Sequence, residues 1–179
     1  MSPLKIVGLI IAILFFAGLL FPTIPYCGPG PLRIMAKNDV VQIVNALKNY
    51  HIEYGHFPGV TPDGFCETAE ANAKLMQIIL GLDKTENPRD IRFLEVPKTR
   101  RSIWKSRSRS GIDSANGAWI DPWGNFYRIR ITADSTTTVQ SPYSDEKPLP
   151  PDTHFIVWSV GKDGVQGSSV KSDDVTSWR

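Results

Sequence analysis

The sequence has 179 residues, of which 41% are hydrophobic and 21% are charged, and its formal net charge at pH 7 is +2. This length suits one domain with a substantial apolar core. The nearly balanced charge gives no electrostatic reason to expect nucleic acid as a partner, and no internal repeat indicates a solenoid.

The N-terminal part of the chain carries an uninterrupted apolar run from residue 6 to residue 21, preceded by Lys5. A helix of this length is at the short end for crossing about 30 Å of hydrocarbon, so we expect neighbouring residues to extend it into an anchor over residues 1–24. A cleaved signal peptide shares the charged start and apolar middle, but no clean small-x-small cleavage site follows. The sequence therefore favours a single-pass membrane anchor.

Residues 25–33 are rich in proline and glycine and predict a semi-extended neck, because proline fixes φ and lacks an amide donor. Cys27 lies in this neck, and Cys66 lies in a loop farther along the chain. Two cysteines in a domain outside the cytoplasm are compatible with a disulfide, and two free thiols fit the sequence equally well. Their spacing does not match that of a zinc site.

The longest amphipathic segment runs from Ile34 to Tyr54 and opens a globular domain that we expect to span residues 34–179. Its apolar residues recur at alternating spacings of four and three, which places them on one side of a helix. Gly55 and Pro58 supply the stop. The residues predicted to form this buried stripe are Ala36, Val40, Ile43, Leu47, Tyr50 and Tyr54.

A second helix is predicted from Thr68 to Leu82, with Thr68 as its N-cap. Its apolar stripe would contain Ala71, Leu75, Ile78 and Leu82. A short strand is expected over residues 91–96 because of their composition. The basic run 98–109 favours a solvated loop over a patch for nucleic acid or acidic lipid.

Strand and turn signals dominate from residue 114 onward. The dipeptide Asn116–Gly117 tolerates positive φ, and the sequence Asp-Pro-Trp-Gly-Asn at residues 121–125 predicts another tight turn. Alternating apolar residues predict a strand over residues 126–132, and a strongly apolar segment predicts a central strand over residues 154–160. We expect both strands to pack on the long helix.

The C-terminal segment combines glycines with three carboxylates. Asp163 lies between Gly161 and Gly164, and Asp173 and Asp174 follow later in the same segment. Hard oxygen ligands on a glycine-rich turn suit Ca²⁺, although the alternating acidic positions and closing glutamate of an EF-hand are missing. Taken without the rest of the chain, these residues favour an ordinary acidic surface loop.

Taken together, the motifs resemble the G-type major pseudopilin family of type II secretion. The resemblance covers nearly the whole chain apart from residues 84–115 and 133–152. It rests on the apolar segment ending at Pro22, the helix end Tyr-Gly-His-Phe-Pro at residues 54–58, the turn from Asp121 to Tyr127, and an ending that contains Ser159, Gly161, Asp163, Gly164, Asp173, Asp174, Val175 and Trp178.

This resemblance implies an α+β, pilin-like fold, in which a long amphipathic helix packs on a small antiparallel sheet and a C-terminal loop holds Ca²⁺. It implies that Asp163 and Asp173 are the side-chain ligands, with Asp174 adjacent and the carbonyls of Val160 and Val165 as helpers. The implied protein is a non-enzymatic structural subunit of the secretion pseudopilus.

The resemblance also implies a place in the cell and a set of partners. We expect one span of the bacterial inner membrane, with the C-terminal domain in the periplasm. The implied partners are other pseudopilins and inner-membrane secretion components, together with self-association into a filament.

The N-terminus departs from the family pattern. No short basic leader ending in glycine precedes the apolar run, and Lys5 stands where the register from Pro22 places the family's glutamate. A lysine would repel the neighbouring subunit's amine, which that glutamate is thought to neutralise. The alternative expectation is therefore a membrane-tethered pilin-fold binding domain that does not polymerise.

An enzyme is not expected from these residues. The three histidines are scattered along the chain, and no nucleophile motif such as G-x-S-x-G occurs.

Overall fold

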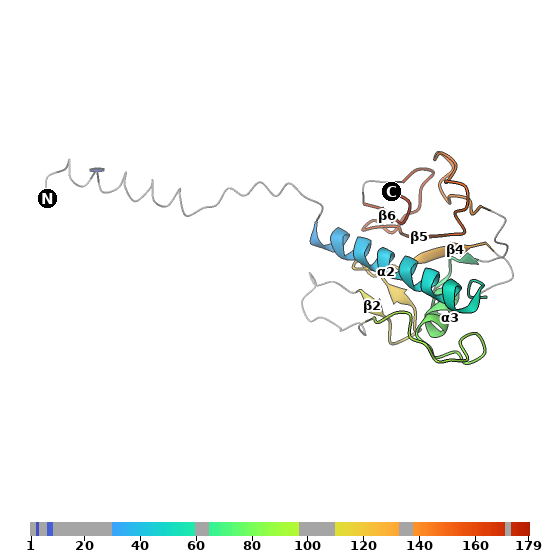
Figure 1. Cartoon of the computed structure of the whole chain (residues 1–179). Coiled ribbons are helices and arrows are strands. Elements are labelled where there is room, and N and C mark those ends of the chain that lie inside the picture. The colour runs from blue at the N-terminus through green and yellow to red at the C-terminus, as the bar shows by residue number, and fades with distance from the viewer. Residues whose placement is uncertain are drawn as a thin grey trace.

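The computed structural model describes residues 30–59, 65–96, 110–132, 138–170 and 173–179, together with Pro3, Val7 and Gly8. These ranges form an α+β domain that contains two well-formed helices and two antiparallel sheets (Figure 1). Nearly all of the predicted anchor, most of the neck with Cys27, and the basic run 98–109 lie outside the described residues. Across the described ranges, we find no helix with the length and hydropathy of a membrane span.

Helix α2 spans Pro31–Tyr54 and begins slightly earlier than the sequence predicts. Proline suits a first helical turn because the amide it lacks has no intrahelical partner there. The helix ends at Gly55, whose φ of 75° lets its N–H donate to the carbonyl of His51 at 2.8 Å. The predicted stripe is buried as expected, except that Tyr54 is only half-buried.

Helix α3 spans Ala69–Ile79, and the Thr68 hydroxyl caps it by accepting from the N–H of Ala71 at 3.2 Å. The predicted extension to Leu82 is wrong, and the Leu82 side chain is exposed. Gly81 has a φ of 74°, and the N–H of Leu82 turns back to the carbonyl of Gln77 at 2.8 Å. This left-handed turn satisfies the last carbonyls of the helix and ends it.

The predicted strand over residues 91–96 is also wrong, because the structure has no strand there. The buried Asn87 side chain donates to the carbonyls of Ile78 and Ile91, both at 2.8 Å, and accepts from the N–H of Ile91 at 3.1 Å. The N–H of Phe93 donates to the carbonyl of Ile79 at 2.9 Å. Backbone groups that a neighbouring strand would use are therefore bonded to the end of α3 and to Asn87.

The main sheet has the strand order β1-β4-β5-β6, and every pair is antiparallel. The predicted strands 126–132 and 154–160 correspond to β4, Arg128–Ile131, and β5, Phe155–Ser159. Two short strands lie where the sequence predicts loops, namely β1, Phe65–Cys66, and β6, Val175–Thr176.

A second, two-stranded sheet pairs β2, Gly111–Ile112, with β3, Trp119–Ile120. The turn between them contains the predicted Asn116–Gly117 dipeptide. Gly117 has a φ of 81°, and its N–H donates to the carbonyl of Asp113 at 2.8 Å. The predicted use of positive φ at this turn is confirmed.

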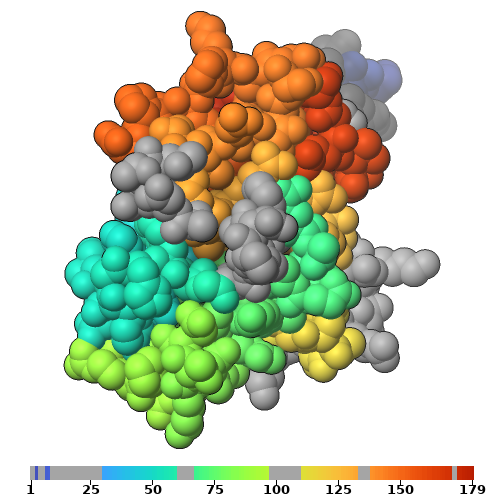
Figure 2. Space-filling model, turned by 90° about the vertical axis from the view of Figure 1, so that its right-hand side faces the viewer, coloured from blue at the N-terminus to red at the C-terminus, as the bar shows by residue number. Residues whose placement is uncertain are grey.

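The core lies between the helices and one face of the main sheet (Figure 1). Val157 of β5 packs in this core with the buried stripe of α2, so the predicted packing of the long helix on the sheet is confirmed. The neighbouring Ile156 and Trp158 belong to a second, smaller cluster, because successive side chains of a strand point to opposite faces. Figure 2 shows the cyan end of α2 between the orange residues above and the lime segment after α3 below.

Candidate metal centre

The three predicted carboxylates of the C-terminal segment come together after β5. Asp163, Asp173 and Asp174 each offer one carboxylate oxygen, and these oxygens lie within 4.8 Å of one another. Asp163 is exposed, Asp173 is half-buried and Asp174 is buried. We call these three residues the acidic cluster.

Gly161 makes the approach of the two halves of this loop possible. Its φ is 68°, and a Cβ atom at this position would lie 2.5 Å from the backbone carbonyl oxygen of Asp173. No side chain fits at that distance, and positive φ strains most other residues. Gly161 therefore brings the returning chain against the end of β5.

Backbone amides orient two of the carboxylates. Asp173 Oδ2 accepts from the N–H groups of Lys162 and Asp163, at 3.0 and 3.1 Å. Asp163 Oδ1 accepts from the N–H of Val165 at 2.9 Å. The loop thus holds its acidic side chains in a defined arrangement.

The spacing of the cluster fits a hard divalent cation. Oxygen ligands lie about 2.3–2.6 Å from Ca²⁺, so two ligands of one ion are at most about 5 Å apart. The 4.8 Å limit on the three carboxylate oxygens meets this condition. Val160 is buried directly after β5 and Val165 is exposed in the loop, so both flank the cluster, and their carbonyls remain predicted ligands.

The sequence analysis missed the role of Asp121, which is fully buried beneath this loop. Its Oδ1 accepts from the N–H groups of Trp123, Gly124 and Asn125, at 2.9, 2.8 and 2.9 Å. Its Oδ2 accepts from the hydroxyl of Ser159 at 2.5 Å. Burial raises the pKa of Asp121, and these hydrogen bonds oppose that rise.

Two further hydrogen bonds join the turn at residues 121–125 to the loop that carries the acidic cluster. The Ser159 hydroxyl accepts from the N–H of Gly161 at 3.0 Å, and the Asn125 side-chain amide donates to the carbonyl of Gly161 at 2.8 Å. An aspartate before Pro-Trp-Gly does signal a side-chain-capped turn in the sequence. Nothing local could reveal the bond to Ser159, because it depends on the sheet that brings the two segments together.

Residues 138–152 contact the C-terminal residues of the chain through Glu146. Glu146 Oε2 accepts from the indole N–H of Trp178 and from the hydroxyl of Ser141, both at 2.9 Å, and Oε1 pairs with Arg179. The side chain of Glu146 is almost fully buried. No role was predicted for Glu146, which lies within residues 133–152, a part of the chain that the family resemblance does not cover.

Tyr143 from the same segment lies against the acidic cluster. Burial raises the pKa of its hydroxyl, and the nearby charge of Asp174 raises it further. The backbone N–H of Asp145 also donates to the carbonyl of Ser168 at 3.0 Å. Residues 138–152 therefore brace the loop from the side opposite to α2.

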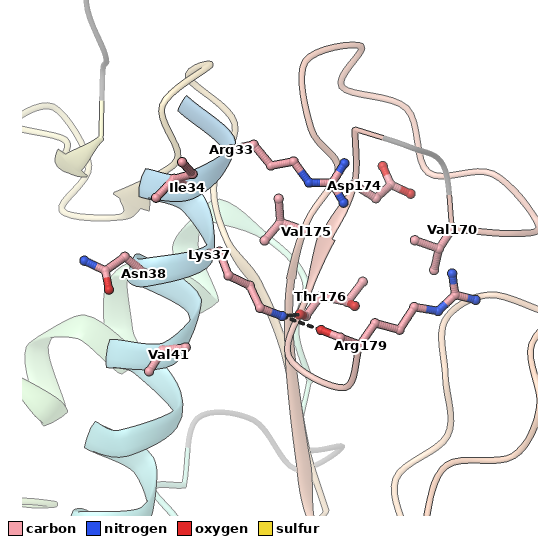
Figure 3. A pocket seen from close by; sticks show the side chains of 10 residues that line it. All are labelled: Arg33, Ile34, Lys37, Asn38, Val41, Val170, Asp174, Val175, Thr176 and Arg179. Atoms are coloured by element: carbon pink, nitrogen blue, oxygen red, sulfur yellow. Dashed lines mark hydrogen bonds between the residues drawn. The ribbon is translucent and has the colours of Figure 1, made fainter. Parts of the chain in front are cut away.

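On the α2 side, a groove of about 640 Å³ separates the first turns of the helix from the C-terminal segment (Figure 3). Lys37 Nζ crosses this groove and donates to the carbonyl of Thr176 at 2.8 Å and to a main-chain oxygen of Arg179, the last residue of the sequence. Desolvation and the charge of Arg33 lower the pKa of Lys37. Asp174 lines the groove and also belongs to the acidic cluster.

We compared the chain with known proteins. A scan against protein-family models and a search of curated proteins each found no match to this chain.

Proposed function

We propose that this chain is a non-enzymatic structural subunit of a type II secretion pseudopilus, with a pilin-like fold that Ca²⁺ stabilises. One observation carries the proposal. The two most specific motifs of the family resemblance, the turn at residues 121–125 and the acidic ending, meet in one hydrogen-bonded unit around Ser159 and Gly161. Two motifs that resembled the family only by chance would not be expected to form hydrogen bonds with each other.

The arrangement of the helices and the sheet adds support. A long amphipathic helix at the N-terminal side of the domain packs on an antiparallel sheet, as the pilin-like fold requires. Pseudopilin function needs the outer surface of the domain for neighbouring subunits and needs no reacting side chains. Other pseudopilins and inner-membrane secretion components are the partners that we propose.

Calcium has a structural role in this proposal. Three carboxylates held within 4.8 Å repel one another, and a divalent cation relieves that repulsion. An ion that binds only the native state adds to the free energy of unfolding. The loop that carries the acidic cluster would then be rigid outside the cytoplasm, where calcium is available.

A membrane-tethered domain that binds a partner without polymerising is the second candidate. Lys5, at the position expected for the family's glutamate, favours it. The groove beside α2 favours it as well, because a groove of this size is large enough for a small ligand or a peptide side chain.

A topology experiment tests what the two candidates share. We expect a C-terminal alkaline-phosphatase fusion of the full chain to be active, since the domain would lie in the periplasm. An inactive fusion, together with an active cytoplasmic reporter at the same position, would contradict both candidates.

Incorporation into the pseudopilus separates the two candidates. In cells that make the secretion filament, we expect chemical crosslinks between this chain and other pseudopilins, and we expect Lys5→Glu to increase them. Lys48→Glu, an exposed change on α2, is the matched control. If neither the wild type nor Lys5→Glu enters filaments, the tethered domain becomes the better account.

A further inference from the structure

The groove between α2 and the C-terminal segment combines positive charge with apolar walls. Arg33 and Lys37 reach into it from α2, and Arg179 lies on its opposite side (Figure 3). Val41 and Val175 contribute apolar surface to the lining.

The two α2 cations differ in their partners. Within residues 30–59, 65–96, 110–132, 138–170 and 173–179, no Asp or Glu side chain lies within ion-pair distance of Arg33 or Lys37, but Lys37 donates to a main-chain oxygen of Arg179, the last residue of the sequence. Arg179 differs, since it pairs with Glu146. The acidic lining residue Asp174 is buried. Arg33 therefore gives this groove a positive charge that can meet an anion, and Lys37 lies beside it.

Exposed apolar side chains border the same turns of α2. Ile34 is 57% exposed, Met35 is 41% exposed and Val41 is 44% exposed. Side chains of this size on a helix next to basic residues are typical of segments that lie in a membrane interface, where apolar groups enter the lipid and cations meet phosphates.

The position of these residues in the chain restricts what they can reach. The predicted anchor ends at residue 24, and α2 begins at Pro31. The residues between them span at most about 20 Å when fully extended. The first turns of α2 would therefore stay close to the membrane surface whenever the chain is anchored.

We propose that this groove and its apolar border bind the phosphate headgroup of an anionic phospholipid in the membrane that anchors the chain. The proposal rests on the membrane anchor of the proposed function. Arg33 supplies a planar set of donors that matches phosphate, and Lys37 has one ammonium hydrogen beyond the two used by the main-chain oxygens of Thr176 and Arg179. Ile34, Met35 and Val41 lie against the acyl side of the interface.

The test uses the full chain in nanodiscs of phosphatidylcholine alone and in nanodiscs that also contain phosphatidylglycerol. Hydrogen exchange of the backbone amides in residues 33–41 and 174–179 reports docking. We expect slower exchange with phosphatidylglycerol, and we expect added salt to reverse the difference because the contact is electrostatic.

Substitutions inside and outside the groove test whether the slower hydrogen exchange arises from docking at the groove. Arg33→Gln should weaken docking on the anionic nanodisc about fivefold, the effect of one basic residue at an anionic surface. Arg33→Lys should retain most of it. Lys48→Gln, which removes an exposed charge farther along the same helix, should leave it unchanged. Lys37→Gln is the second variant, and the loss of its charge should also weaken docking on the anionic nanodisc.

The possible failures are distinguishable. A chain that does not remain in either nanodisc overturns the anchor and, with it, this proposal. A chain that stays in both but shows the same exchange in both overturns the lipid site alone. Protection that appears only after other secretion proteins are added has the same consequence and makes the groove a protein-docking surface.

Discussion

The two faces of the main sheet are stabilised in different ways. On the face covered by α2 and α3, the buried cluster is almost wholly aliphatic and aromatic, with Ile43, Leu47 and Ile129 fully buried. On the other face, a smaller cluster around Trp158 includes Trp178, whose indole N–H donates to a buried carboxylate. That carboxylate belongs to Glu146, which also accepts from the Ser141 hydroxyl and pairs with Arg179.

This difference predicts two levels of stability. Burial of apolar surface is insensitive to ions and to pH near neutrality, so the α2 face should open only when the whole domain unfolds. The second face depends on charge, and removal of a carboxylate or a cation should release it locally. A loop of that kind can respond to calcium while the remainder of the fold is unchanged.

The largest effect should follow from a charge in the α2 face. Leu47 is fully buried, and Leu47→Asp would place an unpaired carboxylate among apolar side chains at a loss of several kcal/mol. We expect no cooperative thermal transition by circular dichroism. Lys48→Asp, at the exposed next position, should melt nearly as the wild type does. A folded Leu47→Asp protein would contradict the assigned core.

The buried carboxylate of Asp121 should come next. Asp121→Asn keeps the shape of the side chain but weakens the bonds to three backbone amides and to Ser159, with an expected loss of about 1–3 kcal/mol in urea unfolding. Asp113→Asn is the matched control, since the carboxylate of Asp113 accepts from the N–H of Ala115 in another turn. Equal losses for the two variants would remove the special role of Asp121.

A smaller, local effect is expected at Glu146. Glu146→Gln removes the charge that pairs with Arg179 and weakens the bond from Trp178, so the end of the chain should be released by about 1–2 kcal/mol. We expect faster carboxypeptidase trimming from residue 179, with the global melting temperature nearly unchanged. Glu95→Gln, an exposed change, should show neither effect. A large drop in the global melting temperature would place Glu146 in the main folding unit instead.

The smallest effect concerns pH and Asp39, which joins α2 to the sheets by accepting from the Tyr127 hydroxyl at 2.8 Å and from Ser110. Burial raises the pKa of Asp39 above 3.8, its hydrogen bonds lower it in part, and the charge of Asp121 raises it again. The folded state therefore keeps the proton to higher pH than the unfolded state. The resulting stability is fully present below pH 3.8 and is lost as the pH rises through the folded-state pKa.

Asp39→Asn cannot ionise, so its stability relative to the wild type should increase as the pH rises from 3.8 and then level off. Urea unfolding of both proteins over a pH series measures this difference. A relative stability that falls over the same window would mean that the hydrogen bonds outweigh burial and that the pKa of Asp39 is lowered.

Long-period patterns made much of the fold predictable. The stripe of α2 and the two central strands follow from the spacing of apolar residues, which reflects the geometry of each element alone. β1 and β6 were missed because two residues carry no period, and their strand character comes from pairing with β4 and β5. Leu82 was misplaced because the helical pattern was continued past Gly81, where a positive φ turns the chain away.

The candidate site also has a part that was predicted from the sequence and a part that was not. The acidic cluster was predicted through the family resemblance, because the glycines and carboxylates of the C-terminal segment alone favoured an ordinary acidic loop. Asp121 and Glu146 were not, since each acts on residues distant in sequence, Ser159 in one case and Trp178 in the other. Their roles depend on which faces of the sheet the loops cover.

A melting experiment with calcium tests the central claim most directly. The full chain is melted with calcium and with a chelator, beside Asp173→Asn and, as a control, Asp152→Asn at an exposed position. At a hundredfold excess over the dissociation constant, binding to the native state alone would add about 2.7 kcal/mol. We expect calcium to raise the melting temperature of the wild type and of Asp152→Asn, to protect residues 160–178 from protease, and to do neither for Asp173→Asn. Equal melting temperatures of the wild type in both buffers, without protection of that segment, would contradict the account and leave an ordinary acidic loop.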